Sequence, residues 1–124
     1  MKFDSIPNPS INLTSSRRSF GRASLTLPKI GFGTWKIGGG SFADPKTDPV
    51  SLAALHSALE IGYIHFDTAE MYANGHAEEL LGKAVRSSQA RAEPGRSVKR
   101  EALFITSKVT PSHLQYNDVL TSCE

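Results

Sequence analysis

Short apolar runs alternate along this chain with longer segments that carry apolar residues at helical spacing. The runs are 30–33, 63–66 and 102–105, and helical spacing occurs over 48–62 and 76–86. A short apolar run between turn residues is typical of a buried strand, whereas apolar residues three and four positions apart are typical of a covering helix. Parallel strands need such helical crossovers between them. The order of segments therefore predicts an α/β fold with a parallel sheet.

Turn and capping residues place the boundaries of the helices. Asp48 is a candidate N-cap, Pro49 suits the first helical position, and Gly62 is a typical stop signal. After Pro111, Asn117 is a possible cap for the first turns of a third helix. The residues expected on the buried faces of the first two helices are Leu52, Leu55, Leu59, Leu80, Leu81, Ala84 and Val85.

Two segments lack this regular pattern. Residues 1–19 are rich in Ser, Pro and Asn, which predicts a flexible N-terminal extension, with order beginning near Phe20. Leu25 and Leu27 then alternate with polar residues, which predicts a hairpin arm before the first buried strand. Residues 87–100 are expected to form a loop.

Composition narrows the possible functions. The chain has 124 residues with 39% hydrophobic content, which suits one small domain, and a net charge of +2 is too mild to indicate nucleic-acid binding. Basic residues gather over 83–101, but no aromatic residue is interleaved among them for base stacking. No apolar run approaches the roughly 20 residues that span a bilayer. The lone Cys123 suits a reducing compartment and is too isolated for a metal site, so we expect a cytoplasmic protein without a metal.

Three polar residues, Asp67, Tyr72 and Lys108, follow the second and third apolar runs. If both runs are parallel strands, these side chains converge at one edge of the sheet. A nearby ammonium favours the phenolate form of a tyrosine, and a carboxylate holds the ammonium charged and oriented. Such a trio suits giving a proton to a carbonyl oxygen while a nicotinamide supplies the hydride that no side chain can donate.

Each residue of this trio also has a plainer interpretation. An Asp after a strand is often a helix cap, a loop Tyr is usually a packing residue, and a surface Lys is the default. Their joint position favours the functional interpretation, because active sites of (β/α)₈ barrels lie at the C-terminal ends of the strands.

Three stretches closely resemble the aldo-keto reductases. They are Ile30-Gly31-Phe32-Gly33-Thr34-Trp35-Lys36, then His65 through Gly75 (HFDTAEMYANG), and Phe104-Ile105-Thr106-Ser107-Lys108-Val109. The resemblance covers about residues 20–124 and implies the N-terminal portion of a (β/α)₈ TIM barrel, about three β/α units with a preceding hairpin arm. A whole barrel takes about 250 residues, so this portion is an incomplete barrel.

The resemblance also implies roles for individual residues. Asp67, Tyr72 and Lys108 match three members of the family's catalytic tetrad, with Tyr72 as the general acid. The residues implied in binding the cofactor NADP(H) or the substrate are Gly33, Thr34, Trp35, Lys36 and Asp67. The implied activity is reduction of a small aldehyde or ketone to an alcohol.

Departures from the family pattern leave alternatives open. The fourth tetrad member, a His on the next strand, and the segments that bind the cofactor phosphate have no counterpart in these 124 residues. We therefore expect the isolated chain to be inactive. The alternatives are an inactive product, or a binding or regulatory subunit that keeps the fold without the chemistry. Gly75 stands where some family members carry Glu.

Overall fold

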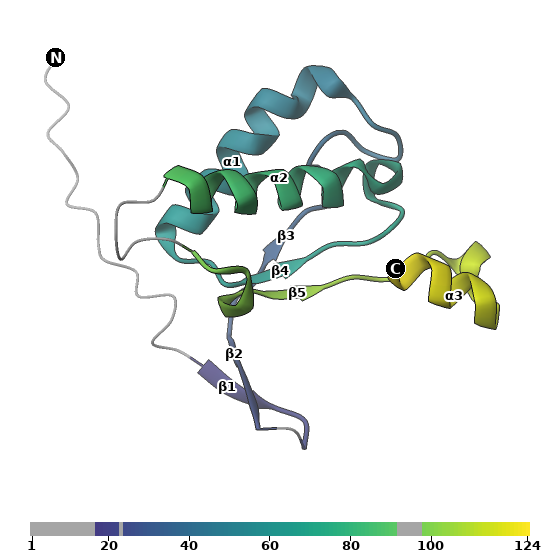
Figure 1. Ribbon diagram of the computed structural model, residues 1–124, viewed down its shortest axis with the longest axis horizontal. Helices are drawn as coiled ribbons and strands as arrows, with labels where there is room; N and C mark the ends of the chain where they lie inside the picture. Colours follow the sequence, from purple (N-terminus) through teal and green to yellow (C-terminus); the bar gives the residue numbers. More distant parts are fainter. Residues whose placement is uncertain (1–16, 23, 92–97) are drawn as a thin grey trace, which may run out of the picture.

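The computed structural model describes residues 17–22, 24–91 and 98–124, and a parallel sheet lies at its centre. The sheet has the order β3-β4-β5, formed by Phe32–Gly33, His65–Asp67 and Phe104–Thr106. Helices α1 (Asp48–Ile61) and α2 (His76–Arg91) connect successive strands and lie on the same face of the sheet (Figure 1). This arrangement confirms the predicted α/β fold with parallel strands.

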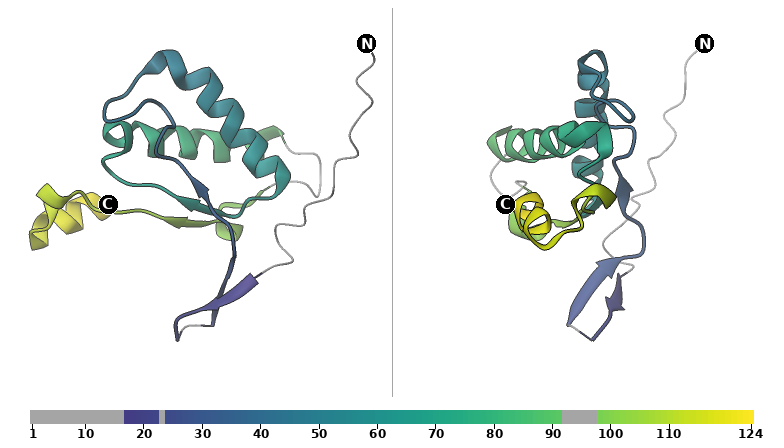
Figure 2. Two further views of the ribbon diagram at one scale, coloured as in Figure 1. Left: turned by 180° about the vertical axis from the view of Figure 1, so that it is seen from behind. Right: turned by 90° about the vertical axis from the view of Figure 1, so that its right-hand side faces the viewer.

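An antiparallel hairpin precedes the sheet. Strand β1 (Arg17–Phe20) pairs with β2 (Leu25–Pro28), and Figure 2 shows the hairpin standing apart from helices α1 and α2. The predicted hairpin arm is therefore present. The structure places residues 17–19 of the predicted extension 1–19 in β1, where they pair with β2. Residues 1–16 lie outside the described part of the chain.

The first helix begins differently from the prediction. Asp48 is the first residue of α1 and not its N-cap, because a 3-10 turn over Pro45–Thr47 leads directly into the helix. Asp44 caps that turn by accepting a hydrogen bond from the Lys46 amide at 3.2 Å. This leaves the Asp48 carboxylate free for another partner. At the other end, Gly62 adopts a left-handed φ of 101° and ends α1 as predicted.

Three later boundaries also differ. Helix α2 continues past the predicted end at residue 86 to Arg91, since no Gly or Pro interrupts 87–91, so the predicted loop loses these residues. Residues 92–97 of that loop lie outside the described residues. A 3-10 turn at Arg100–Ala102 delays the third strand to Phe104. The short helix α3 (Tyr116–Cys123), which follows a 3-10 turn at Pro111–His113, has its N-cap at Gln115 and not at Asn117.

The core lies between the sheet and the two helices. In β4, Phe66 is fully buried towards the helices, whereas His65 and Asp67 alternate to the other face. The core residues on the two helices include Leu55, Leu59, Leu80, Leu81, Ala84 and Val85, as predicted. Leu52 is partly buried against this cluster. Within the described ranges, every helix is too short or too polar to cross a membrane.

The segment between β3 and α1 contains Gly38, Gly39 and Gly40 and packs tightly on itself; these three residues form the glycine loop. Gly39 has a φ of 137°, and a Cβ at this position would lie 2.2 Å from the carbonyl oxygen of Phe42. We expect Gly39→Ala to lower the free energy of unfolding by about 1–3 kcal/mol, because the loop must shift or strain to accept the methyl group. Urea denaturation followed by circular dichroism measures the change.

The neighbouring glycine supplies the control for this prediction. A Cβ at Gly40 would meet only the flexible end of Lys36, at 3.8 Å. Gly40→Ala should therefore leave the denaturation midpoint nearly unchanged. Equal midpoints for both variants would show that the close approach at Gly39 is absent in solution.

Candidate active site

The parallel register brings the predicted trio together at the C-terminal ends of the strands, which form one edge of the sheet. Asp67 is the last residue of β4 and pairs in register with Thr106, the last residue of β5. Lys108 follows β5 by two residues, and Tyr72 begins a 3-10 turn (Tyr72–Gly75) after β4. All three side chains therefore start at or just beyond the C-terminal ends of neighbouring strands, as the sequence predicted.

Lys108 is the central group of this cluster. Its Nζ donates hydrogen bonds to both carboxylate oxygens of Asp67, at 3.0 and 2.9 Å, and to the carbonyl oxygen of Thr68 at 2.7 Å. Partial burial disfavours the charged ammonium, but Asp67 and Tyr72 outweigh this effect and raise the pKa of Lys108 above its ordinary value. Lys108 is thus held as a cation whose position is set by a carboxylate and a backbone carbonyl.

The ring of Tyr72 lies close to both this cation and an indole ring. The Nζ of Lys108 is 4.9 Å from the centre of the Tyr72 ring, and Trp35 contacts the ring edge to face with a centroid distance of 4.9 Å. After Tyr72, the backbone takes positive φ at Ala73 (49°) and Asn74 (54°), which side chains rarely adopt. The Ala73 amide donates to the Gly40 carbonyl at 2.9 Å, which ties this strained turn to the glycine loop.

The residues expected to contact a cofactor fall into two groups. Thr34 is fully buried and bonds to the Asp67 carbonyl oxygen through its amide (3.0 Å) and its hydroxyl (3.1 Å), so it holds β3 against β4. Gly33, Trp35 and Lys36 are exposed, and Lys36 Nζ lies 5.9 Å from the Trp35 ring centre. Trp35 is 41% exposed, so it is not a core residue.

This open edge fits a nicotinamide cofactor. A Cβ at Gly33 would meet no atom within 4 Å, so the space beside this backbone is open to a ligand. The side chains of Asp67 and Lys108 are 47% and 46% exposed, which leaves polar atoms available to hydroxyl and amide groups of a ligand. The side chain of Thr34 supports β3 from within, while Gly33, Trp35, Lys36 and Asp67 are open to a ligand.

Two polar clusters near the trio were missed by the sequence reasoning. Glu70 accepts hydrogen bonds from the Thr110 amide at 2.8 Å and from His113 at 2.6 Å. The hydrogen bond from Thr110 lowers the pKa of Glu70, and burial offsets part of this effect. His76 contacts two carboxylates, from Asp48 and Glu79. Of these contacts, only the one between His76 and Glu79 had a sequence signal, the His-x-x-Glu spacing at a helix start. The partners in the other contacts are distant along the chain.

Parallel β/α units with polar side chains gathered at the C-terminal ends of the strands are the arrangement that β/α barrels use for their active sites. The chain belongs to the aldo-keto reductases, since the model described as "Aldo/keto reductase family" matches residues 29–124. The structure is accordingly the N-terminal portion of a (β/α)₈ barrel, and the predicted family and fold are confirmed.

Individual relatives agree with this assignment. Methylglyoxal reductase YeaE of Escherichia coli is 34% identical over 100 residues, which are 81% of this chain and 30% of that protein. The thermostable aldo-keto reductase Tm1743, solved with the inhibitor epalrestat, is 42% identical with a TM-score of 0.74, over 86% of this chain and 35% of that one. An aldo/keto reductase of Klebsiella pneumoniae, solved with NADP and acetate, is 32% identical with a TM-score of 0.62, over 81% of this chain and 30% of that one. The chain thus spans about a third of their length.

Proposed function

We propose that this chain carries the proton-delivery part of an NADP(H)-dependent reductase that converts aldehydes or ketones to alcohols. The observation that supports this most directly is the Asp67–Lys108–Tyr72 cluster, in which a carboxylate-held ammonium lies 4.9 Å from a tyrosine ring at the open edge of the sheet. Solved relatives that contain NADP or NADPH support the cofactor. The proposed substrate is a small carbonyl compound.

Tyr72 is the proposed general acid. Its hydroxyl gives a proton to the carbonyl oxygen as negative charge develops there, and the ammonium of Lys108 stabilises the resulting phenolate. Asp67 keeps Lys108 charged and holds it in place through two hydrogen bonds. Trp35 also contacts the Tyr72 ring edge to face, which restricts the positions of the hydroxyl.

The same edge would hold the nicotinamide end of the cofactor. Gly33, Trp35 and Lys36 would lie along it, and Asp67 would accept from a ribose hydroxyl, while Thr34 keeps the two strands in register. The cofactor, when bound, supplies the hydride that reduces the carbonyl carbon.

The isolated 124-residue chain is not expected to catalyse carbonyl reduction. Residues 20–124 are proposed as only the N-terminal part of the reductase domain, and they include the matched segment 29–124. The proposal therefore concerns a complete barrel that contains this segment. We also propose a cytoplasmic location, for which the unpaired, exposed Cys123 is the support.

A chimaera tests the proposed function. Residues 17–124 replace the matching segment of the thermostable relative with 42% identity, and the remainder of that barrel supplies the other strands. We expect the purified chimaera to oxidise NADPH in the presence of small aldehydes, followed by absorbance at the nicotinamide band. The isolated 124-residue chain, assayed in parallel, should show no turnover.

Two results would contradict these expectations in different ways. A folded chimaera that binds NADPH but reduces none of a broad aldehyde and ketone panel would favour a binding or regulatory role. Turnover by the isolated chain that disappears in Tyr72→Phe would show that these residues suffice for catalysis. A melting curve with a single cooperative transition establishes that the chimaera is folded before either conclusion is drawn.

A further inference from the structure

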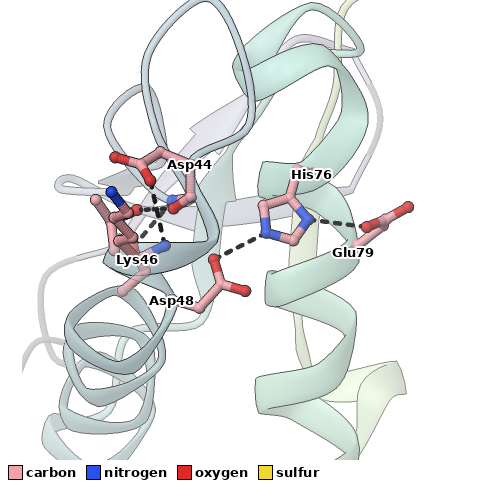
Figure 3. Close-up of polar contacts among 8 residues, drawn as sticks. Asp44, Lys46, Asp48, His76 and Glu79 are labelled. Atoms are coloured by element: carbon pink, nitrogen blue, oxygen red, sulfur yellow. Dashed lines mark hydrogen bonds and ion pairs between the residues drawn. The ribbon is translucent and has the colours of Figure 1, made fainter.

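His76 lies between two carboxylates at the starts of both long helices. Its Nε2 is 2.8 Å from Asp48 Oδ1, and its Nδ1 is 2.9 Å from Glu79 Oε2. Figure 3 shows the ring between α1 and α2, with one nitrogen directed at each carboxylate. The side chains of His76 and Asp48 are only 19% and 24% exposed, so the bond between the helices is largely shielded from water.

Both contacts exist together only when His76 is charged. An ionised carboxylate only accepts hydrogen bonds, and a neutral imidazole has a single N–H to donate. Two carboxylate partners therefore require the imidazolium. Hydrogen bonds to Glu79 and then to Asp48 raise the pKa of His76 above its ordinary value of 6.5, against a smaller opposing effect of burial.

The imidazole also supports the loop that precedes α1. A Cβ at Gly38 would lie 2.8 Å from His76 Cδ2, so the glycine backbone rests directly on the ring. The Gly38 amide donates to the Ser51 hydroxyl of α1 at 2.9 Å, and two residues later the Gly40 carbonyl accepts from Ala73. The ring thus joins the glycine loop, the start of α1 and the start of α2.

The two chain segments that meet at this junction both lead to the aromatic pair Trp35 and Tyr72 of the candidate active site. Trp35 precedes the glycine loop, and Tyr72 begins the strained turn that ends at His76. Because the Ala73 amide bonds to Gly40, a shift of the loop relative to α2 would move Tyr72 against Trp35.

We propose that His76 is a positioning residue for Tyr72, which it holds against Trp35 by joining Asp48, Glu79 and the glycine loop. The importance of this positioning for catalysis rests on the proposed function, in which Tyr72 is the general acid. The positioning itself needs neither cofactor nor turnover.

The direction of the pH effect follows from the charges that face the ring. Asp48 comes from α1 and Glu79 from α2, Lys36 is the cation near the glycine loop, and Asp44 is engaged with the Lys46 amide. With the folded-state pKa raised above 6.5, the stabilisation is complete below pH 6.5 and is lost as the pH rises through the raised value. Above it, one of the two carboxylate contacts must be given up.

Trp35 is the only tryptophan in the sequence, so its fluorescence reports on the aromatic pair directly. We expect the emission and acrylamide quenching of the purified 124-residue chain to change with pH between 5.5 and 9, with quenching greater on the alkaline side. His76→Gln should abolish this transition and show the greater quenching throughout. Asp48→Asn keeps the contact to Glu79 and offers an NH2 group that can donate to a neutral imidazole, so it should reduce the transition and move its midpoint to lower pH.

Two other histidines provide matched controls. His56 also links the long helices, through a 2.8 Å bond to Ser87, but lies away from the glycine loop, and His113 pairs with Glu70. His56→Gln and His113→Gln should retain the His76-dependent transition. The proposal is overturned if His76→Gln and Asp48→Asn both keep the wild-type titration, or if His56→Gln loses it equally. Failure of NADPH turnover in the chimaera would leave this fluorescence result unaffected, so the two failures are distinguishable.

Discussion

Tyr72→Phe is expected to slow carbonyl reduction by the chimaeric barrel about 10²- to 10⁴-fold, the usual contribution of a positioned general acid. The substitution removes only the hydroxyl, so the edge-to-face contact with Trp35 and the position of Lys108 over the ring can persist. The affinity for NADPH should therefore change little. Steady-state kinetics with a reactive aldehyde, together with NADPH binding measured by fluorescence, separates the two quantities.

A second tyrosine gives the control for this experiment. Tyr63 is partly buried and contacts Phe32 edge to face at 5.7 Å, on the side of the sheet that faces the helices. Tyr63→Phe should retain nearly full turnover. If Tyr72→Phe reduced NADPH affinity as strongly as turnover, Tyr72 would be a binding or structural residue and the proposed acid would have to be sought elsewhere.

The positions of Asp67 and Lys108 were predictable because they depend on the order and parallel pairing of the strands. In parallel β/α units, a polar residue that directly follows an apolar run lies at the C-terminal edge of the sheet, whatever the details of packing. Asp67 and Lys108 are 41 residues apart, yet the register of β4 and β5 brings them to 2.9 Å. Alternating strand and helix patterns therefore carried most of the information needed for this site.

The contact between His76 and Asp48 joins two helices, and no local sequence pattern specifies it. Asp48 has the residue type and position of a helix cap, and the sequence alone favoured that role. The 3-10 turn before α1 places Asp48 inside the first turn, which leaves its carboxylate free to reach a histidine 28 residues away. A local rule failed here because a tertiary hydrogen bond replaced a capping bond.

The C-terminal end of α2 is a second place where the sequence pattern does not specify the structure. The apolar pattern weakens after residue 86, which favoured a loop there. The helix nevertheless continues, since 87–91 contain no Gly or Pro and the Ser87 hydroxyl bonds to the Ala84 carbonyl at 3.1 Å within the helix. A polar, exposed last turn carries little hydrophobic signal, so its length is poorly specified by periodicity.

Phe66→Ala should unfold this chain more effectively than any other single truncation in the described core. Phe66 is fully buried, lies in the central strand β4 and contacts Phe32 with a ring distance of 5.7 Å. Removing a buried phenylalanine ring costs about 3–5 kcal/mol, and whole domains have a free energy of unfolding of only about 5–15 kcal/mol. We expect the cooperative urea transition seen by circular dichroism to be lost or shifted to very low urea.

Phe42→Ala tests whether burial is the cause of this effect. Phe42 is 79% exposed beside the glycine loop, so its truncation should change the free energy of unfolding by no more than about 0.5 kcal/mol. The two variants remove the same side chain, and only its surroundings differ. A cost at Phe42 close to that at Phe66 would mean that the glycine loop is covered in solution. A small cost at Phe66 would mean that the sheet does not pack on α1 and α2 as described, and the geometry of the Asp67–Lys108–Tyr72 cluster would lose its support.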